Sequence, residues 1–469
     1  MLPFGTTTSL LPHQGDAVAK VLPSRVSGLF MEMGTGKTRT SIELAKIRAH
    51  RIDRVVWCCP VSLKETIRQE ILRHTDCRDV YVFDDKTRPG SLPDDRWYVV
   101  GLESLSNSSR VTLALRQAIT DRTMVVVDES SYIKGHDSRR TKRITLLASH
   151  ARYRMILTGT PLSQGVVDLY AQMSFLSPKI LGYNSFYAFA NNHLEYSDKF
   201  PGMIVRSHNL KYLAAKIAPY VYQVAKAECL TLPEKLYETR YLQLTREQRG
   251  AYEQAKEEIL LDLEPDDFDS ITIFRLFTAL QSIVCGFWTR EGELITLPHR
   301  RLDALTTVIR DIPGPEPVVI WSKFRYCLDQ IVGALGGEYG AEAVARFHGG
   351  LSEKQRAAEL ERFRGGARFL VATQSAGGHG LTLTEAAHAV FYADGFKYSE
   401  RIQAEDRIHR IGQNRPVTYM DIHCSGTIDD RISAALGEKG STLEKFRTAV
   451  QKLRKNGTKA DLRKLVMGL

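Results

Sequence analysis

Two series of short apolar runs, separated by helix-length segments, constrain the fold of this chain more than any other feature. The first series comprises VVWCCP (55–60), YVVG (98–101), MVVVDE (124–129) and MILTGT (155–160). The second comprises VVIWS (318–322), FLVAT (369–373), AVFYAD (389–394) and VTYMDIH (417–423). Short continuous runs rich in Val and Ile are typical of parallel strands that are buried on both faces. The sequence therefore predicts an α/β architecture that occurs twice.

The segment between the two series differs in character, and residues from about 165 to 295 are predicted to be largely helical. We expect a first lobe (1–175), a helical insert and linker (176–295), a second lobe (296–435) and a basic helical tail (436–469). In the tail, four apolar residues recur at helical spacing: Leu443, Phe446, Val450 and Leu453. This helix is expected either to dock on the second lobe or to contact DNA as an arm.

The charge balance indicates a polyanionic partner. Lys and Arg together number 64 against 54 for Asp and Glu, a net charge of +10, which suits a nucleic acid or an anionic membrane. No apolar stretch approaches the roughly 20 residues that a membrane span needs, and the first residues do not resemble a signal peptide. The seven cysteines form no CxxC pair, so neither a zinc site nor a disulfide framework is expected. We expect a protein that is soluble inside the cell.

The strongest local motif is MEMGTGKTRT (31–40), which lies between an apolar segment and a helical pattern. Gly34 and Gly36 permit a tight turn that brings backbone N–H groups against phosphate oxygens. Lys37 is expected to reach the β- and γ-phosphates, and the Thr38 hydroxyl to ligate Mg²⁺. Met31 stands where the strict pattern has glycine, so the motif depends on its strand–loop–helix context.

A pair of carboxylates ends the run MVVVDES (124–130). Asp128 is a candidate ligand of Mg²⁺, and Glu129 is a candidate base that orients and deprotonates an attacking water. The alternative is an ordinary strand followed by a polar turn. The phosphate loop earlier in the chain favours the catalytic interpretation.

An arginine-bearing segment, SERIQAEDRIHRIGQ (399–413), lies far downstream. If it is helical, Gln403, Arg407 and Arg410 share one face. Two arginines on one face can stabilise the charge of a transferring phosphoryl group. The alternative is a surface helix with ion pairs that involve Glu405 and Asp406.

The order of the motifs resembles the SWI/SNF-type ATPases, a branch of helicase superfamily two. The strings that carry the resemblance are LLPHQGDAV, MEMGTGKT, CCPVSLKETIRQE, DESSYIK, LTGTPLSQGVVDLYAQMSFLSP, TLPEK, LTREQRGAY, WSKF, RFHGG, VATQSAGGHGLTLTEAAHAVFYAD and QAEDRIHRIGQ. The resemblance runs from about Leu11 to Asp430. The resemblance implies two RecA-like parallel-sheet lobes with a helical insert between them.

The resemblance also implies the site residues. ATP would be held by His13 and Gln14 at the adenine, by Gly34, Thr35, Gly36, Lys37 and Thr38 at the phosphates, and by Gly380 and Gln403. Lys37, Asp128 and Glu129 would act in catalysis from the first lobe, and Arg407 and Arg410 from the second when the cleft closes. Thr38 and Asp128 would bind Mg²⁺. Backbone contacts to double-stranded DNA would come from Ser62, Lys64, Gly101, Gly377, Gly378, Thr382 and Thr384.

Several positions depart from the family pattern. Ser131 replaces a histidine that links the nucleotide to the coupling motif, and Gln164 replaces an asparagine. Gln223 and Val224 stand where many members carry paired arginines. These changes put the coupling between hydrolysis and DNA binding in doubt.

The implied activity is a DNA-stimulated ATPase that translocates on duplex DNA as a monomer, without sequence preference and without separating the strands. The alternatives are a strand-separating helicase of repair or restriction, a nucleotide-gated DNA-binding scaffold, and an RNA helicase. The expected compartment is the cytoplasm, the nucleoid or the nucleus, or the host cytoplasm for a virus-encoded protein.

Overall fold

The structure, a computed structural model, describes residues 4–159, 165–196, 204–261, 270–377, 381–438, 449 and 459–469. The chain separates into two compact units, Met1–Thr231 (unit 1) and Leu232–Leu469 (unit 2). Each unit contains one large sheet in which all paired strands are parallel. The predicted α/β architecture with two parallel-sheet lobes is therefore confirmed. The boundary falls inside the predicted insert, so residues 176–231 belong to unit 1 and residues 232–295 to unit 2.

Seven strands form the sheet of unit 1, in the order β3-β4-β2-β5-β6-β1-β9. Their bounds are β1 (Val26–Met31), β2 (Arg54–Cys59), β3 (Val80–Val82), β4 (Trp97–Gly101), β5 (Thr123–Asp128), β6 (Tyr153–Leu157) and β9 (Val221–Val224). The four predicted runs of the first series are β2, β4, β5 and β6. Most strand residues are buried, because helices cover both faces of the sheet.

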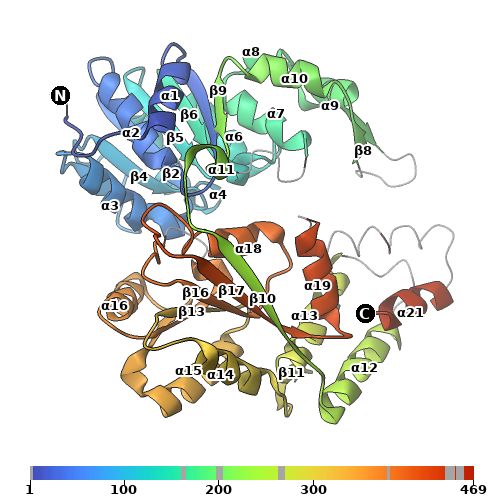
Figure 1. Ribbon diagram of the computed structural model, residues 1–469. Helices are drawn as coiled ribbons and strands as arrows, with labels where there is room; N and C mark the ends of the chain where they lie inside the picture. Colours follow the sequence, from blue (N-terminus) through green and yellow to red (C-terminus); the bar gives the residue numbers. More distant parts are fainter. Residues whose placement is uncertain are drawn as a thin grey trace. The chain divides into compact units, whose positions relative to one another are not determined.

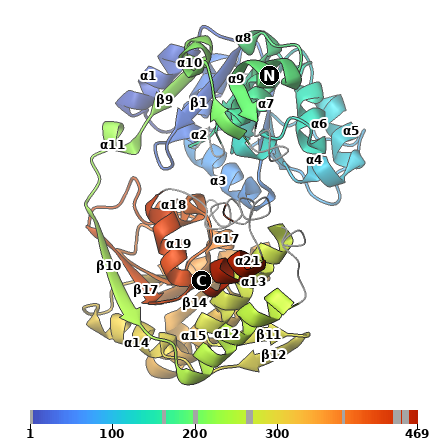
Figure 2. The ribbon, with the colours of Figure 1, turned by 90° about the vertical axis from the view of Figure 1, so that its right-hand side faces the viewer.

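Helices α1 (Pro12–Val21), α2 (Lys37–Ile47) and α3 (Lys64–His74) pack on one face of this sheet. Helices α5 (Ser109–Ala118), α6 (Arg139–Ala148) and α7 (Val167–Leu176) pack on the other; Figure 1 labels α6 and α7, and Figure 2 labels all three. The smaller elements are α4 (Ser104–Asn107), η2 (Ser130–Ile133), α8 (Pro178–Leu181), α9 (Phe186–His193), β7 (Leu194–Tyr196), β8 (Ile204–Ser207), α10 (Leu210–Ile217) and α11 (Lys226–Cys229). Unit 1 is thus a three-layer α/β/α structure.

Six strands form the sheet of unit 2, in the order β10-β17-β16-β13-β15-β14. Their bounds are β10 (Lys235–Leu242), β13 (Val318–Ser322), β14 (Val344–Phe347), β15 (Phe369–Thr373), β16 (His388–Ala393) and β17 (Val417–Cys424). The predicted second series corresponds to β13, β15, β16 and β17. Helices α14 (Arg301–Asp311) and α15 (Arg325–Tyr339) cover one face, and α16 (Glu353–Arg364) and α18 (Tyr398–Glu405) cover the other.

Besides the clusters on the two faces of the sheet, unit 2 has a third hydrophobic cluster, which joins α12 (Arg246–Leu261), α13 (Ser270–Val284), α19 (Ile428–Gly437) and α21 (Lys459–Met467). Figure 2 shows these helices near one another. The end of the chain is fixed on α12, since the Tyr252 hydroxyl donates to the Leu469 carbonyl at 3.1 Å. A hairpin of β11 (Phe287–Arg290) and β12 (Glu293–Thr296) follows α13. The predicted tail helix from Leu443 to Leu453 lies outside the described residues, except Ala449.

Among the described residues, six strands interrupt the predicted helical segment between the lobes: the antiparallel pairs β7–β8 and β11–β12, and the strands β9 and β10. β9 extends the sheet of unit 1 by pairing with β1, and β10 extends that of unit 2 by pairing with β17 over its full length. β10 is an edge strand whose side chains are mostly exposed, so it lacks the continuous apolar run that marks a buried strand. In the described residues, no helix combines the length and the apolar character needed to cross a bilayer.

Candidate active site

The strand order of unit 1 gathers several loops at one edge of its sheet. β5, β6 and β1 are parallel neighbours, so the segments that follow their carboxyl ends lie side by side. The loop after β6 touches the loop after β1, because a Cβ added to Gly159 would stand 3.3 Å from the backbone N of Met33. This edge holds both the phosphate-loop motif and the Asp128–Glu129 pair.

The phosphate-loop motif joins β1 to α2 through two glycines with left-handed backbones. Gly34 has φ of +81° and Gly36, the N-terminal cap of α2, has φ of +90°. No side chain makes a capping hydrogen bond at this end of α2. The first N–H groups of a helix attract anions, and an uncapped helix end leaves room for one. The loop therefore fits a phosphate group.

The helix α2 begins with the two side chains predicted to serve the phosphates and the metal ion. The Lys37 amine donates to the carbonyl of Met31 at 2.8 Å and to that of Glu32 at 3.4 Å. Thr38 is half-buried in the first turn of the helix. A cationic amine and a hydroxyl thus stand at the start of α2, as phosphate and Mg²⁺ binding require.

Both predicted adenine-site residues contact the phosphate loop. The side chains of His13 and Gln14 are buried, and their Nε2 atoms lie 2.8 and 3.1 Å from the carbonyl oxygen of Thr35. Gln14 also fills the space beside Gly36: a Cβ at Gly36 would overlap its Nε2 atom and stand 3.2 Å from its Cδ. The structure therefore brings together the nucleotide-site residues that the sequence predicts in unit 1.

The carboxylate pair stands at the end of β5 in two different environments. Asp128 is 7% exposed, and the indole Nε1 of Trp57 donates to its Oδ2 at 3.4 Å. Burial raises the pKa of Asp128 to about 6; the charge of Glu129 adds to this rise and that of Lys37 opposes it. Glu129 is half-buried and has φ of +52°, a left-handed conformation that is costly for a side chain of this kind.

The segment that follows the carboxylates is bound to α7. The Ser130 hydroxyl donates to Oε1 of Gln172 at 2.6 Å, and the Gln172 amide donates in turn to the Asp168 carbonyl. Ser131, one of the departures from the family pattern, is half-buried in η2. Gln164 lies outside the described residues. Two other departures lie on β9, where Val224 pairs with Met31 directly before the phosphate loop.

Of the predicted DNA-contacting residues of unit 1, Ser62 and Lys64 follow β2 and Gly101 is the last residue of β4, at the same edge of the sheet. Ser62 is exposed, whereas Lys64 is half-buried and its amine donates to the Phe83 carbonyl at 2.8 Å. A Cβ at Gly101 would overlap Cγ2 of Val61. The absence of a side chain at Gly101 thus allows the loops after β2 and β4 to pack together.

In unit 2, the predicted helix with Gln403, Arg407 and Arg410 on one face was wrong. α18 ends at Glu405, and turns follow it, so the two arginines do not continue the helix. They nevertheless meet: Nη1 of Arg407 and Nη1 of Arg410 donate to the Leu381 carbonyl at 3.5 and 3.1 Å. Gln403 is half-buried within α18.

Of the remaining predicted DNA contacts, Thr382 and Thr384 come just after Leu381, the residue whose carbonyl accepts from the two arginines. Thr382 and Thr384 are half-buried, and Gly377 ends the short helix α17 (Gln374–Gly377). Gly378 and Gly380 lie outside the described residues. The two predicted arginines and the predicted threonines Thr382 and Thr384 therefore lie close to Leu381 in unit 2.

Two residues beside these sites were not predicted. Trp57 entered the prediction only as part of the buried run VVWCCP, yet its indole donates to Asp128. Gln413 is buried, and its amide donates to the carbonyls of Ala386 at 2.7 Å and Thr384 at 3.3 Å, which joins the two loops. Gln413 could have been found from the sequence, because it is the last residue of the motif QAEDRIHRIGQ. No sequence pattern pointed to a role for Trp57 beside the carboxylates.

Comparison with known families decides the relationship. Residues 18–285, more than half of the chain, match the family described as SNF2-related domain. The chain belongs to the SNF2-related family. Residues 300–412 match the helicase conserved C-terminal domain, which is the second part of such helicase-like ATPases. The predicted relationship to SWI/SNF-type ATPases is therefore confirmed.

Curated relatives of this SNF2-related chain are longer proteins. The mouse (Mus musculus) DNA annealing helicase and endonuclease ZRANB3 is 27% identical over 467 residues, which are 94% of this chain and 41% of that protein. An uncharacterized ATP-dependent helicase of Mycoplasma genitalium is 25% identical over 325 residues, which are 68% of this chain and 30% of that protein. The SWI2/SNF2 ATPase core of Sulfolobus solfataricus, solved in complex with dsDNA, aligns with 99% of this chain and 98% of its own, at 22% identity and a TM-score of 0.45.

Proposed function

We propose that this chain hydrolyses ATP to ADP and phosphate in response to double-stranded DNA, and moves along the duplex without sequence preference. The observation that carries the proposal is the edge of the unit 1 sheet, where an uncapped helix end and a carboxylate pair meet. Membership of the SNF2-related family supports nucleotide hydrolysis. A net charge of +10 supports a polyanionic partner.

In this proposal the residues of unit 1 bind and orient the nucleotide. Lys37 and the N–H groups at Gly34 and Gly36 neutralise the phosphates, while His13 and Gln14 hold the adenine end. Thr38 and Asp128 are oxygen donors that suit Mg²⁺, which when bound draws charge from the phosphate oxygens. Glu129 orients the attacking water and accepts its proton.

The residues of unit 2 are proposed to complete the chemistry. Arg407 and Arg410 stabilise the negative charge that spreads over the terminal phosphate during transfer, a role worth roughly three to five orders of magnitude in related reactions. Their convergence on one carbonyl supports a joint role. Gln403 and Gly380 are proposed to contact the nucleotide.

Duplex DNA is proposed to contact backbone and hydroxyl groups of both units. The contacts are assigned to Ser62, Lys64, Gly101, Gly377, Gly378, Thr382 and Thr384. Such groups bind phosphates and sugars and cannot distinguish one base sequence from another. We therefore expect affinity to be independent of sequence and to fall steeply as salt concentration rises.

The test is the ATPase rate measured with duplex DNA, single-stranded DNA, RNA and no nucleic acid. Duplex DNA should stimulate the parent chain most. Lys37→Ala and Glu129→Gln should abolish turnover and keep DNA affinity, whereas Arg407→Ala and Arg410→Ala should bind ATP and hydrolyse it slowly. Lys20→Ala, a change at an exposed position of α1, is the control and should leave turnover unchanged.

Two results would reject the proposal. Turnover in Lys37→Ala equal to that of the parent would remove the assigned ATP site. Stimulation by RNA or single-stranded DNA above that by duplex DNA would remove the assigned partner. Displacement of a triplex-forming strand from a duplex measures the movement itself.

A further inference from the structure

The turn that carries Arg407 and Arg410 depends on one residue, Glu405, for much of its backbone hydrogen bonding. The carbonyl oxygen of Glu405 accepts from the backbone N of Ile408 at 3.1 Å and from that of His409 at 3.0 Å. The Tyr419 hydroxyl donates to the same oxygen at 2.9 Å. A shift of Glu405 would therefore move the turn between the two arginines.

The carboxylate of Glu405 is buried and bound by three side chains. Glu405 is 2% exposed, and it accepts from Nε of Arg401 at 2.9 Å, from Nζ of Lys235 at 3.0 Å and from the Tyr237 hydroxyl at 2.9 Å. Burial favours the neutral acid, but the charges of Arg401 and Lys235 prevail and lower the pKa of Glu405. The carboxylate is therefore ionised at neutral pH.

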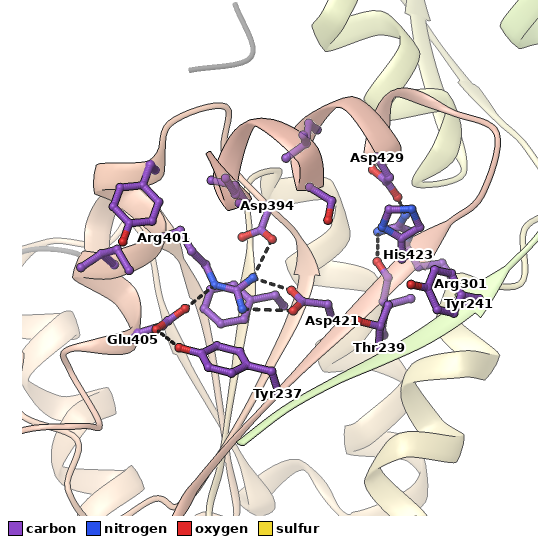
Figure 3. Close-up of a pocket in the computed structure, with 18 residues that line it drawn as sticks. Tyr237, Thr239, Tyr241, Arg301, Asp394, Arg401, Glu405, Asp421, His423 and Asp429 are labelled. Atoms are coloured by element: carbon purple, nitrogen blue, oxygen red, sulfur yellow. Dashed lines mark hydrogen bonds and ion pairs between the residues drawn. The ribbon is translucent and has the colours of Figure 1, made fainter. Parts of the chain in front are cut away.

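Two of the three donors to Glu405 come from β10, and the third belongs to a wider ionic cluster. Figure 3 shows Asp394, Asp421 and Glu405 pointing toward the guanidinium of Arg401, with Tyr237 beside Glu405. Arg401 also lies over the Phe391 ring, 3.4 Å from its centroid. A cavity of about 360 Å³ adjoins this cluster. Arg401 is thus held by several partners, whereas Lys235 and Tyr237 supply the contacts to β10.

A second contact ties the same turn to the residues just before β10. Nε2 of His409 lies 2.7 Å from the carbonyl oxygen of Pro233. The carbonyl of Glu234 accepts from the backbone N of Val417, so these residues are also fixed to β17. Unit 2 begins at Leu232. The first residues of unit 2 therefore bind the arginine-bearing turn at both Glu405 and His409.

We propose that Glu405 is a positioning residue that links β10 to the arginine-bearing turn. Its carboxylate is bound by Lys235 and Tyr237 of β10, and its carbonyl fixes the turn, so the position of β10 determines the positions of Arg407 and Arg410. A displacement of the chain at Leu232 moves Pro233 and Lys235, because they follow it closely in the backbone. The contacts of Pro233 with His409 and of Lys235 with Glu405 then move the turn. Catalysis is sensitive to small displacements of charged groups, so loosening this tie lowers the rate of the chemical step. The inference rests on the proposed function, because it assigns a support to residues proposed there to act on ATP.

The test uses conservative changes on β10 in the full chain. Lys235→Met and Tyr237→Phe each remove one donor to Glu405. Tyr241→Phe is the matched control, since Tyr241 is on the same strand, is 68% exposed and has its ring against His423. Lys235→Arg keeps the positive charge that Lys235→Met removes, so its ATPase rate should be close to that of the parent chain. Each variant is compared by DNA-stimulated kcat, KM for ATP, melting temperature, and hydrogen exchange of residues 406–413.

We expect Lys235→Met and Tyr237→Phe to lower kcat by about tenfold, with KM changed less than about twofold, because the ground-state binding of ATP is untouched. Exchange of residues 406–413 should quicken in both variants and stay unchanged in Tyr241→Phe. The double variant should lose no more than about the larger single loss, since both changes act through Glu405.

Two outcomes overturn the inference. The first is unchanged exchange of residues 406–413 in both variants, which means that β10 does not hold the turn. The second is faster exchange with parental kcat, which means that the tie serves stability alone. A parent chain that hydrolyses no ATP with any nucleic acid refutes the proposed function instead, and that result is seen before any variant is compared.

Discussion

Replacing Gly36 with alanine tests the geometry of the phosphate loop most directly. Gly36 has φ of +90°, a conformation that disfavours any side chain. The new Cβ would also overlap Nε2 of Gln14. Gln14 is buried, so its side chain cannot move aside without leaving its partners. Gly36→Ala therefore adds backbone strain and displaces Gln14.

The size of the effect follows from these two contributions. A left-handed conformation costs a residue with a Cβ about 1–2 kcal/mol. Displaced Gln14 loses two hydrogen bonds, one to the Thr35 carbonyl and one from the backbone N of Leu11, both at 3.1 Å. At about 1 kcal/mol each, these add roughly 2 kcal/mol. We expect unit 1 to lose about 3–4 kcal/mol of stability, which lowers its melting temperature by roughly 6–16 °C.

The assay is scanning calorimetry of the full chain on a double-mutant cycle of Gly36→Ala with Gln14→Ala. Gly90→Ala is the control, since Gly90 has φ of +80° and a Cβ there would meet nothing within 4 Å. Gly90→Ala should lower the stability only by the backbone strain. Because Gly90 lies in unit 1, the shift that this variant causes also identifies which unfolding transition in the scan belongs to unit 1. When Gln14 is already alanine, Gly36→Ala should also cost only that strain, a coupling of about 2 kcal/mol.

Equal destabilisation by Gly36→Ala and Gly90→Ala would refute this reasoning, because it would mean that Gln14 does not fill the space beside the loop. An additive cycle would do the same. The affinity for a non-hydrolysable ATP analogue, measured by titration calorimetry, should fall in Gly36→Ala and be unchanged in Gly90→Ala, which lies far along the chain from the phosphate loop.

Three further predictions concern single side chains. Glu129→Asn should stabilise unit 1 by about 1 kcal/mol in calorimetry and abolish ATP turnover, because asparagine tolerates the φ of +52° but cannot replace the carboxylate; a less stable variant would contradict the strain. Gln413→Ala should destabilise unit 2 by about 2 kcal/mol, since the carbonyls of Ala386 and Thr384 lose their donor; an unchanged melting temperature would exclude this bracing role. Glu405→Gln should destabilise unit 2 most above pH 4.5, which is the ordinary pKa of a glutamate side chain. The pKa of Glu405 is lowered, so its stabilisation is lost as pH falls through the lower folded-state value, and a pH-independent difference would contradict it.

Local sequence was sufficient for the buried strands and for the phosphate loop. Runs such as MVVV (124–127) and FLVA (369–372) are uninterrupted apolar stretches, and every residue of β5 and β15 is buried, as expected for strands covered on both faces. In the phosphate loop, Gly34, Gly36 and Lys37 are close in sequence, so their order alone fixes the turn and the start of α2. Both predictions rest on patterns within a few consecutive residues, which is why no tertiary information was needed.

Contacts between distant parts of the sequence decided the remainder. β10 has an exposed pattern and becomes a strand because β17, some 180 residues later, supplies its hydrogen bonds. α18 stops at Glu405, whose carbonyl and carboxylate are taken by Tyr419, Lys235 and Tyr237. The sequence thus determined the buried strands and the phosphate loop, whereas only tertiary structure determined the edge strand β10 and where the arginines stand, because both depend on partners that no local pattern specifies.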